Sequence, residues 1–259
     1  MASKEPIQFK SRDGATIYGY LTKPNLGKEK YPLIVVVHGG PFGPRDSWFF
    51  DLDAQVFANA GYAVLQVNYR GSGGFGAKYK EVAYLKLHTM IMNDIKDGTR
   101  WAMSQKDIDN KACVYGWSFG GYAAARLSIF GDGLFKCAIA AAGVFDEEYQ
   151  NTTADYSSSK RLQRSVAQQY GDDPKLWREQ SPITYANQVN IPILIIHGGK
   201  DTRVPPKQAE RFKDTLEKYG KTVEWLYKKE EPHGFLKHEN LVEMYQKSIA
   251  FFDRYLKSS

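Results

Sequence analysis

The stretch KACVYGWSFGGYAAARLSIF, residues 111–130, decides the fold. It opens with the apolar run ACVY, typical of a buried strand, and ends in an alanine-rich run typical of a helix. Ser118 lies between the two, with Gly116 and Gly120 two positions away on either side. The pattern G-x-S-x-G at such a junction is a nucleophile elbow, a strained turn that exposes the serine hydroxyl. Strand and helix approach so closely there that side chains at the two glycine positions would collide.

The rest of the chain alternates short apolar strands with helices, which implies a mostly parallel α/β sheet covered on both faces. Residues 7–22 read as a β-hairpin at one edge of that sheet, because IQFKS and TIYGYLT flank the turn signal RDG. Residues 147–180 are polar and break the alternation, so we expect them to form a helical cap over the strand ends. Ligands of open α/β sheets bind at those ends. One domain over residues 1–259, with a small cap, is the predicted organisation.

An activated serine needs a base, and on this kind of sheet the chain order is serine, acid, histidine. His233, in EEPHGF, follows the last predicted strand and is the predicted base. His197 ends the strand IPILII and is expected to hydrogen-bond its own loop, and His238 is expected to be an exposed or capping residue. His38 and His88 precede the serine, so the chain order excludes both.

The acid that orients the base is expected in the loop after the preceding strand. Asp201, in HGGKDTRVPP, occupies that place, although G-K-D is also ordinary turn chemistry. Asp146 and Asp155 lie earlier, while Asp172 and Asp173 precede a proline in the manner of a turn or helix cap. Asp201 is therefore the predicted acid.

Acyl transfer also needs hydrogen-bond donors for the oxyanion. The backbone N–H of Phe119, directly after the serine, is one predicted donor. The loop HGGP, residues 38–41, resembles the oxyanion loops of lipases and esterases, and Gly40 N–H is the predicted second donor. A tight turn is the simpler reason for the two glycines and does not exclude that role.

Composition removes several other classes of function. The 35 basic and 29 acidic residues give a net charge of +6 without a basic stripe, which argues against nucleic-acid binding. No apolar run approaches the ~20 residues of a membrane span, and no signal peptide is evident, so a cytoplasmic location is expected. No histidines stand at metal-ligand spacing, and GSGGFG does not fit a dinucleotide fingerprint, so neither a metal nor a cofactor is predicted. Cys113 and Cys137 lie in apolar runs and are expected to be buried free thiols.

Six motifs together closely resemble the catalytic α/β-hydrolase domain of the prolyl oligopeptidase family, in its acylaminoacyl and dipeptidyl peptidase branch. They are HGGP (38–41), NYRGSGGFG (68–76), GWSFGGY (116–122), FKCAIAAAGV (135–144), HGGKDTRVP (197–205) and PHGF (232–235). The resemblance implies Ser118 as nucleophile, Asp201 as acid and His233 as base, with an oxyanion hole from Gly40 and Phe119. It also implies a pocket for the residue before the cleaved bond, lined by Val144 and Val204, with Phe145 and Tyr149 as further candidates.

The chain departs from that family in three respects. It shows no β-propeller, so it is expected to be either an excised catalytic domain or a stand-alone hydrolase. His38 stands where the dipeptidyl branch carries a tyrosine, and FDEEYQ (145–150) lacks the aromatic set that surrounds proline. Proline specificity is therefore not expected.

Two charged sites have competing interpretations. Arg70 either grips a substrate carboxylate or, as the preferred reading, forms a salt bridge to Asp94 or Asp97. Glu147, with Glu148, either binds a free amino terminus or belongs to a solvated cap face.

The predicted function is a serine hydrolase that cleaves short peptides, aminoacyl amides or small esters through an acyl-enzyme. A carboxylesterase with little peptidase activity and a non-catalytic binding module are the alternatives. The partner is a small-molecule or short-peptide substrate, and homo-oligomer formation is left open.

Overall fold

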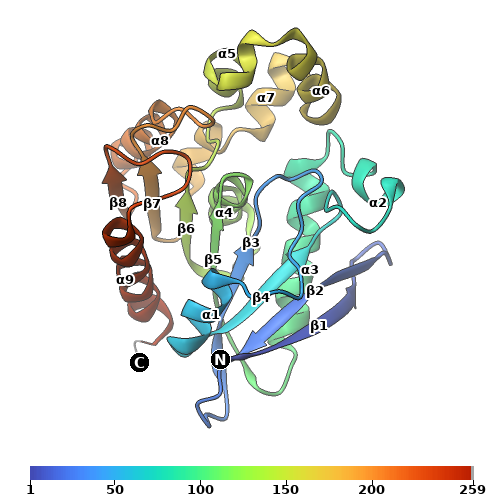
Figure 1. The fold of residues 1–259 in the computed structure, drawn as a ribbon, viewed down its shortest axis with the longest axis vertical. Helices are drawn as coiled ribbons and strands as arrows, with labels where there is room; N and C mark the ends of the chain where they lie inside the picture. Colours follow the sequence, from blue (N-terminus) through green and yellow to red (C-terminus); the bar gives the residue numbers. More distant parts are fainter. Residues whose placement is uncertain (258–259) are drawn as a thin grey trace.

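The computed structural model describes residues 1–257, which form one eight-stranded sheet flanked by helices (Figure 1). The strand order is β1-β2-β4-β3-β5-β6-β7-β8. Strand β2 pairs antiparallel with β1 and β4, and every other pairing is parallel, which confirms the predicted α/β sheet. The strands are β1 (Ser3–Lys10), β2 (Thr16–Lys23), β3 (Tyr31–Val37), β4 (Ala63–Asn68), β5 (Ile108–Trp117), β6 (Phe135–Ala141), β7 (Ile193–Gly198) and β8 (Val223–Lys228). The hairpin expected over residues 7–22 corresponds to β1 and β2, which begins four residues earlier at Ser3.

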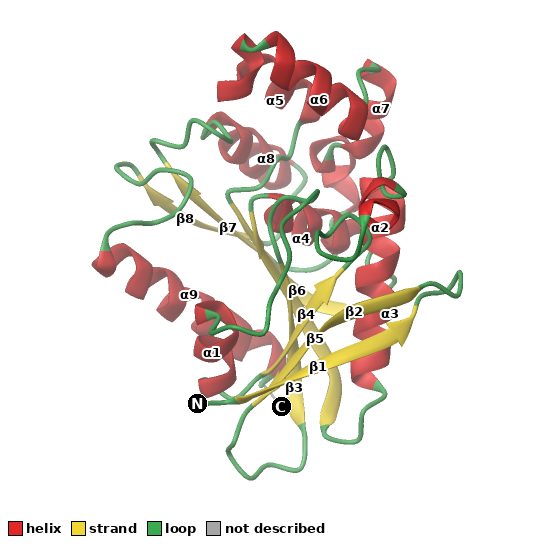
Figure 2. Ribbon diagram, turned by 45° about the vertical axis from the view of Figure 1, so that its right-hand side comes forward, coloured by secondary structure: helices red, strands yellow, loops and turns green. Residues whose placement is uncertain are grey.

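The helices divide into two layers and a cap. Helices α1 and α9 pack on one face of the sheet, and α3, α4 and α8 pack on the other (Figure 2). Helices α5, α6 and α7 lie beyond the ends of the strands, over the segment that the sequence assigned to a cap (Figure 1). The helices are α1 (Leu52–Asn59), α2 (Ala77–Glu81), the π-helix η1 (Leu87–Ile91), α3 (Met92–Met103), α4 (Phe119–Phe130), α5 (Glu147–Thr153), the 3₁₀-helix η2 (Asp155–Ser158), α6 (Lys160–Tyr170), α7 (Pro174–Gln180), the 3₁₀-helix η3 (Pro182–Gln188), α8 (Lys207–Lys218) and α9 (His238–Leu256).

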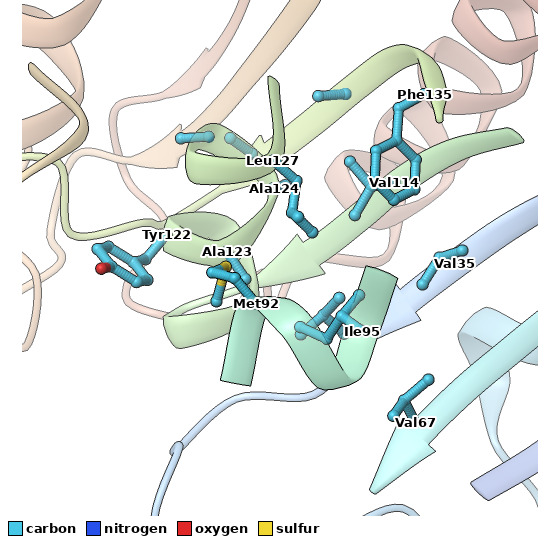
Figure 3. Packing of buried hydrophobic residues seen from close by; sticks show 14 of the residues in the cluster. Val35, Val67, Met92, Ile95, Val114, Tyr122, Ala123, Ala124, Leu127 and Phe135 are labelled. Carbon is cyan, nitrogen blue, oxygen red and sulfur yellow. The ribbon is translucent and has the colours of Figure 1, made fainter. Parts of the chain in front are cut away.

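The central strands are apolar throughout because both of their faces are buried. Side chains alternate across a strand, so in β3 Val35 joins the cluster under α3 and α4, whereas Ile34 and Val36 join the cluster under α1 and α9. Figure 3 shows the first cluster, with Ile95 of α3 and the strand residues Val35 and Val67. Apolar runs of this kind place β3, β5 and β6 in the middle of the sheet, where their carboxyl ends lie side by side.

The expectation of free thiols is wrong, because Cys113 and Cys137 form a disulfide. The two residues are direct partners on the neighbouring parallel strands β5 and β6, and their Cα atoms are 4.8 Å apart. Both side chains point to the face covered by α1 and α9. Burial was expected and is confirmed, but strand register brings the sulfurs together. Disulfides persist mainly in oxidising compartments, so this pair does not favour the cytoplasmic location, which stays a prediction.

Among the helices of residues 1–257, none combines the length and the apolar character that crossing a bilayer requires.

Close backbone packing at the strand-to-helix junction gives a first prediction. A Cβ atom on Gly120 would lie 2.0 Å from the carbonyl oxygen of Val37 at the end of β3. Neither backbone can move aside in a close-packed interior. We expect Gly120→Ala to lower the free energy of unfolding by about 1–3 kcal/mol or more. Chemical denaturation measures this. Gly234→Ala is the matched control, because its Cβ would meet nothing within 4 Å. Equal stability of the two variants would contradict the packing argument.

A buried carboxyl group next to β4 gives a second prediction. One oxygen of Asp46 accepts a hydrogen bond from the Gln66 amide at 2.9 Å, and the other has no partner within residues 1–257. Burial raises the pKa of Asp46 to about 8. A carboxyl group whose pKa is raised by folding stabilises the folded state, and its contribution is complete below the pKa of the unfolded chain. For Asp46 this contribution to stability is lost as the pH rises through about 8. We expect the free energy of unfolding of Asp46→Asn, relative to that of the parent, to be about 1–3 kcal/mol higher at pH 9 than at pH 5. Urea unfolding at both pH values measures the difference, and a pH-independent difference would exclude this role.

Candidate active site

Ser118 is held in a strained turn between β5 and α4. Its φ and ψ are 60° and −120°, in the left-handed half of the map that residues with a side chain rarely adopt. The backbone N–H of Ser118 donates to the carbonyl of Ala141 on β6 at 2.9 Å. A Cβ atom on Gly116 would lie 2.4 Å from the backbone of Gly120, which explains the glycines of the motif. Strain of this kind is typical of functional turns.

Asp201 and His233 meet at the same edge of the sheet. His233 Nδ1 lies 2.7 Å from Asp201 Oδ2, in the loops that follow β8 and β7. The other oxygen of Asp201 accepts the backbone N–H groups of Arg203 at 3.0 Å and Val204 at 2.8 Å. Asp201 is buried, whereas His233 is 31% exposed. A carboxylate at Nδ1 fixes the imidazole tautomer, so Nε2 keeps a lone pair that can accept a proton.

The segment that carries His233 is tied to the elbow. The Trp117 indole N–H donates to the carbonyl of His233, and the Trp117 ring packs edge-on against Phe235 at 5.4 Å. Glu231 fixes the same loop, because its carboxylate accepts from the backbone N–H groups of Leu236 and Lys237. The residue before Ser118 therefore positions the histidine.

His197 has the structural role expected from the sequence. Its Nε2 lies 2.9 Å from the carbonyl of Val204, within its own loop, and its ring is fully buried. Burial lowers the pKa of His197, so the ring is neutral. It supports the loop that carries Asp201.

The HGGP loop lies directly beside the elbow. A Cβ atom on Gly39 would stand 3.5 Å from the Cβ of Ser118, and Gly40 has a φ of 130° that favours glycine. His38 anchors the loop, since its ring nitrogens lie 3.0 Å from the Tyr69 hydroxyl and 2.9 Å from the Ser72 hydroxyl. Burial lowers the pKa of His38 to about 4, so this ring is also neutral.

Gly40 and Phe119 both line the pocket that contains Ser118. Phe119 is the first residue of α4, and no side chain among residues 1–257 caps the N–H groups of that helix end. Uncapped N–H groups at a helix N-terminus are ready donors for an anion. The arrangement is therefore suited to an oxyanion next to Ser118.

The pocket is a cavity of about 200 Å³ between the elbow and the cap. It brings together the predicted residues Ser118, Val144, Val204 and Glu147. Seven lining residues were missed: Tyr122, Gln150, Tyr156, Val166, Gln169, Tyr170 and Arg203. Tyr122 and Arg203 belong to the quoted motifs and were within reach of sequence reasoning. The remaining five come from the cap, whose packing no local pattern specifies.

Phe145 and Tyr149 are not in this pocket, which corrects the prediction. Phe145 is fully buried in the core and stacks on Phe212 of α8 at 4.6 Å. Tyr149 follows Glu147 by two residues in α5, and positions two apart face different sides of a helix. Its ring lies under Arg211 at 5.1 Å, in a separate hollow on the outer side of α5.

Glu147 does not belong to a solvated face. It is only 5% exposed and lines the pocket, whereas its neighbour Glu148 is exposed. Burial, and the nearby Asp146 carboxylate, raise the pKa of Glu147 to about 8.

Arg70 forms a buried salt bridge, as the preferred reading proposed. Its guanidinium binds both oxygens of Asp94, at 2.6 and 2.9 Å, and also contacts Asp13. Asp97 instead pairs with Arg12. Arg70 thereby ties the NYRGSG loop to α3 and leaves no free face for a substrate carboxylate.

Residues 1–257 contain no group of three or more histidine, cysteine, aspartate or glutamate side chains arranged to hold a metal ion.

Comparison with known proteins matches this framework to one family. The model of the prolyl oligopeptidase family, whose members are serine peptidases, matches residues 48–259. The chain belongs to the prolyl oligopeptidase family. Among curated members of the family, dipeptidyl aminopeptidase BIII of Pseudoxanthomonas mexicana is 32% identical over 91% of this chain and 36% of its own length. An uncharacterized peptidase of Bacillus subtilis is 31% identical over 84% of this chain and 33% of its own length. The chain thus spans about a third of the length of these two prolyl oligopeptidase relatives.

Solved structures of the prolyl oligopeptidase type agree with the fold. The acylaminoacyl peptidase of Pyrococcus horikoshii superposes with a TM-score of 0.91 at 28% identity, covering 100% of this chain and 42% of that one. A puromycin-hydrolyzing peptidase of Mycobacterium tuberculosis superposes with a TM-score of 0.90 at 26% identity, covering 100% of this chain and 40% of that one.

Proposed function

We propose that this chain is a serine hydrolase that cleaves short peptides, aminoacyl amides or small carboxylic esters through an acyl-enzyme. The proposal rests on the hydrogen bond of 2.7 Å between His233 and Asp201. The Trp117 indole links the His233 backbone to the elbow that holds Ser118. The family supplies the reaction class. Two of the relatives are a dipeptidyl aminopeptidase and an acylaminoacyl peptidase, and these names support peptide substrates.

The proposed mechanism has two halves. Ser118 Oγ attacks the acyl carbonyl carbon while His233 Nε2 takes the hydroxyl proton, and Asp201 stabilises the imidazolium. The backbone N–H groups of Gly40 and Phe119 hold the oxyanion. His233 then gives the proton to the leaving group, which departs as the ester bond to Ser118 forms. Water repeats the attack on that ester, and the free acid leaves.

Two alternatives make different demands on the same site. A carboxylesterase would cleave esters and leave amides intact. A non-catalytic module would need no activated serine. The strained turn at Ser118 and the oriented histidine therefore argue against a non-catalytic module.

The role of Ser118 gives a third prediction. Ser118→Ala should abolish covalent labelling by a fluorophosphonate and lower turnover of a p-nitrophenyl ester by about 10⁴-fold, because no attacking oxygen remains. Gel fluorescence and initial rates measure both effects. Ser104→Ala, at an exposed helix end, is the matched control and should label and turn over like the parent. Labelling that survives in Ser118→Ala would refute the assignment.

The substrate range gives a fourth prediction. We expect acyl p-nitrophenyl esters to turn over faster than alanyl, prolyl and acyl-aminoacyl anilides, because an amide is the harder bond to cleave. Both classes should turn over, with prolyl anilides disfavoured. Rates over a series of acyl lengths measure the order. Ester turnover alone would favour the carboxylesterase, and failure of both classes would refute the hydrolase.

A further inference from the structure

The pocket beside Ser118 contains a carboxyl group without a counter-charge, and a bound cation would favour its ionised form. Glu147 is 5% exposed, and its backbone is fixed by hydrogen bonds to Ser181 Oγ and from the Asn151 amide, both at 2.9 Å. Its carboxylate forms no ion pair or hydrogen bond with any of residues 1–257. An unpaired buried carboxylate is costly and is rarely kept without a partner.

Three arginines around this wall each have another partner. Arg211 pairs with Asp146 at 2.9 Å on the outer side of α5. Arg203 lines the pocket, but its guanidinium is directed to Asp155 at 3.3 Å, and its residue is largely exposed there. Arg126 donates to the carbonyl of Glu179 and lies over the ring of Phe130. None of the three neutralises Glu147.

The remaining surroundings of Glu147 suit a cation. Tyr122, Tyr156 and Tyr170 line the same pocket, and burial most of all, together with the nearby Glu147 charge, raises the pKa of each hydroxyl. The hydroxyl of Tyr122 is buried and has no hydrogen-bond partner in the described part of the chain. Figure 3 shows this ring at the side of the cluster away from Val35 and Val67. Aromatic faces and an acceptor hydroxyl both stabilise an ammonium group.

We propose that Glu147 makes this pocket selective for an acyl group that carries a positively charged nitrogen, above all the side-chain ammonium of a lysine next to the cleaved bond. The inference rests on the proposed hydrolase function and names its substrate class. Val144, Val166 and Val204 supply apolar wall for the methylene stem, while the ammonium donates to Glu147. A free α-amino group of the acyl residue is the other source of the same charge.

Three matched fluorogenic anilides distinguish the sources: acetyl-lysyl, acetyl-norleucyl and norleucyl with a free amino group. Norleucine keeps the length of the lysine stem without its charge. At pH 7.5 we expect kcat/KM for acetyl-lysyl to exceed that for acetyl-norleucyl by roughly 10- to 100-fold, as for a hydrogen bond to a charged group. Glu147→Gln should remove this preference, so that kcat/KM for acetyl-lysyl falls to that for acetyl-norleucyl measured with the same variant. The exposed Glu148→Gln is the matched control and should keep the preference.

The outcomes separate the two proposals. A Glu147-dependent preference for free norleucyl over acetyl-norleucyl supports the cation pocket with the α-amino group as its occupant. Equal turnover of all three substrates overturns the cation pocket and leaves the hydrolase intact. If no substrate turns over, the hydrolase fails, and a binding measurement still decides the pocket. Hexylammonium, but not hexanol, should then raise the melting temperature of the parent and not of Glu147→Gln. If hexylammonium changes the melting temperature of both proteins equally, or of neither, the inference is overturned.

Discussion

The contact between Gly120 and the carbonyl of Val37 is the constraint on which the site depends. Val37 ends β3 and is followed at once by the HGGP loop, whereas Gly120 lies two residues after Ser118 at the start of α4. Because the two backbones touch, the end of β3 and the elbow cannot shift independently. The contact therefore sets the place of Gly40 relative to Ser118 and Phe119. A side chain at Gly120 would separate Ser118 from the HGGP loop, even if both kept their own conformation.

Parallel pairing supplies the second half of the site. Strands β3, β5, β7 and β8 all end at the same edge, so the loops that follow them meet although they are far apart in the chain. Each loop is then held by its own hydrogen bonds. Asp201 is fixed by the N–H groups of its own turn, and the His233 loop is fixed by Glu231 and Trp117. Since these supports are backbone or buried contacts, the Asp201–His233 geometry exists before any substrate binds.

The sequence predicted the features that depend on local patterns and missed those that depend on packing between distant segments. The strand-to-helix context of Ser118 and the order of the later loops are local patterns, and they predicted Asp201 and His233, whose side chains the structure brings within 2.7 Å of each other. The disulfide depends on register between β5 and β6, which no local pattern specifies. Tyr149 failed as a pocket residue because its place depends on where α5 begins, and a shift of one residue turns a helical side chain by about 100°. Phe145 precedes α5, and its place depends on packing against Phe212 of α8, which is distant in the sequence. The burial of Glu147 depends on how the polar cap closes over the strands, which amphipathic pattern alone leaves undetermined.

The cap is connected to the catalytic loops, so an occupant of the pocket would affect both. Tyr170 donates to the carbonyl of Gly40 at 3.2 Å, and the Gln150 amide donates to the carbonyl of Arg203 at 2.8 Å. The backbone N–H of Asp155 donates to Thr202, next to the Asp201 turn. Helices α5 to α7 are short and largely polar, and such elements rank among the least stable parts of a fold. A charged group that relieves the desolvation of Glu147 would stabilise the cap, and through Tyr170 and Gln150 it would also hold the oxyanion loop and the acid loop in place. Binding energy gained in the pocket would in this way order the groups that act on the carbonyl, which is how contacts remote from the reacting atoms raise a rate.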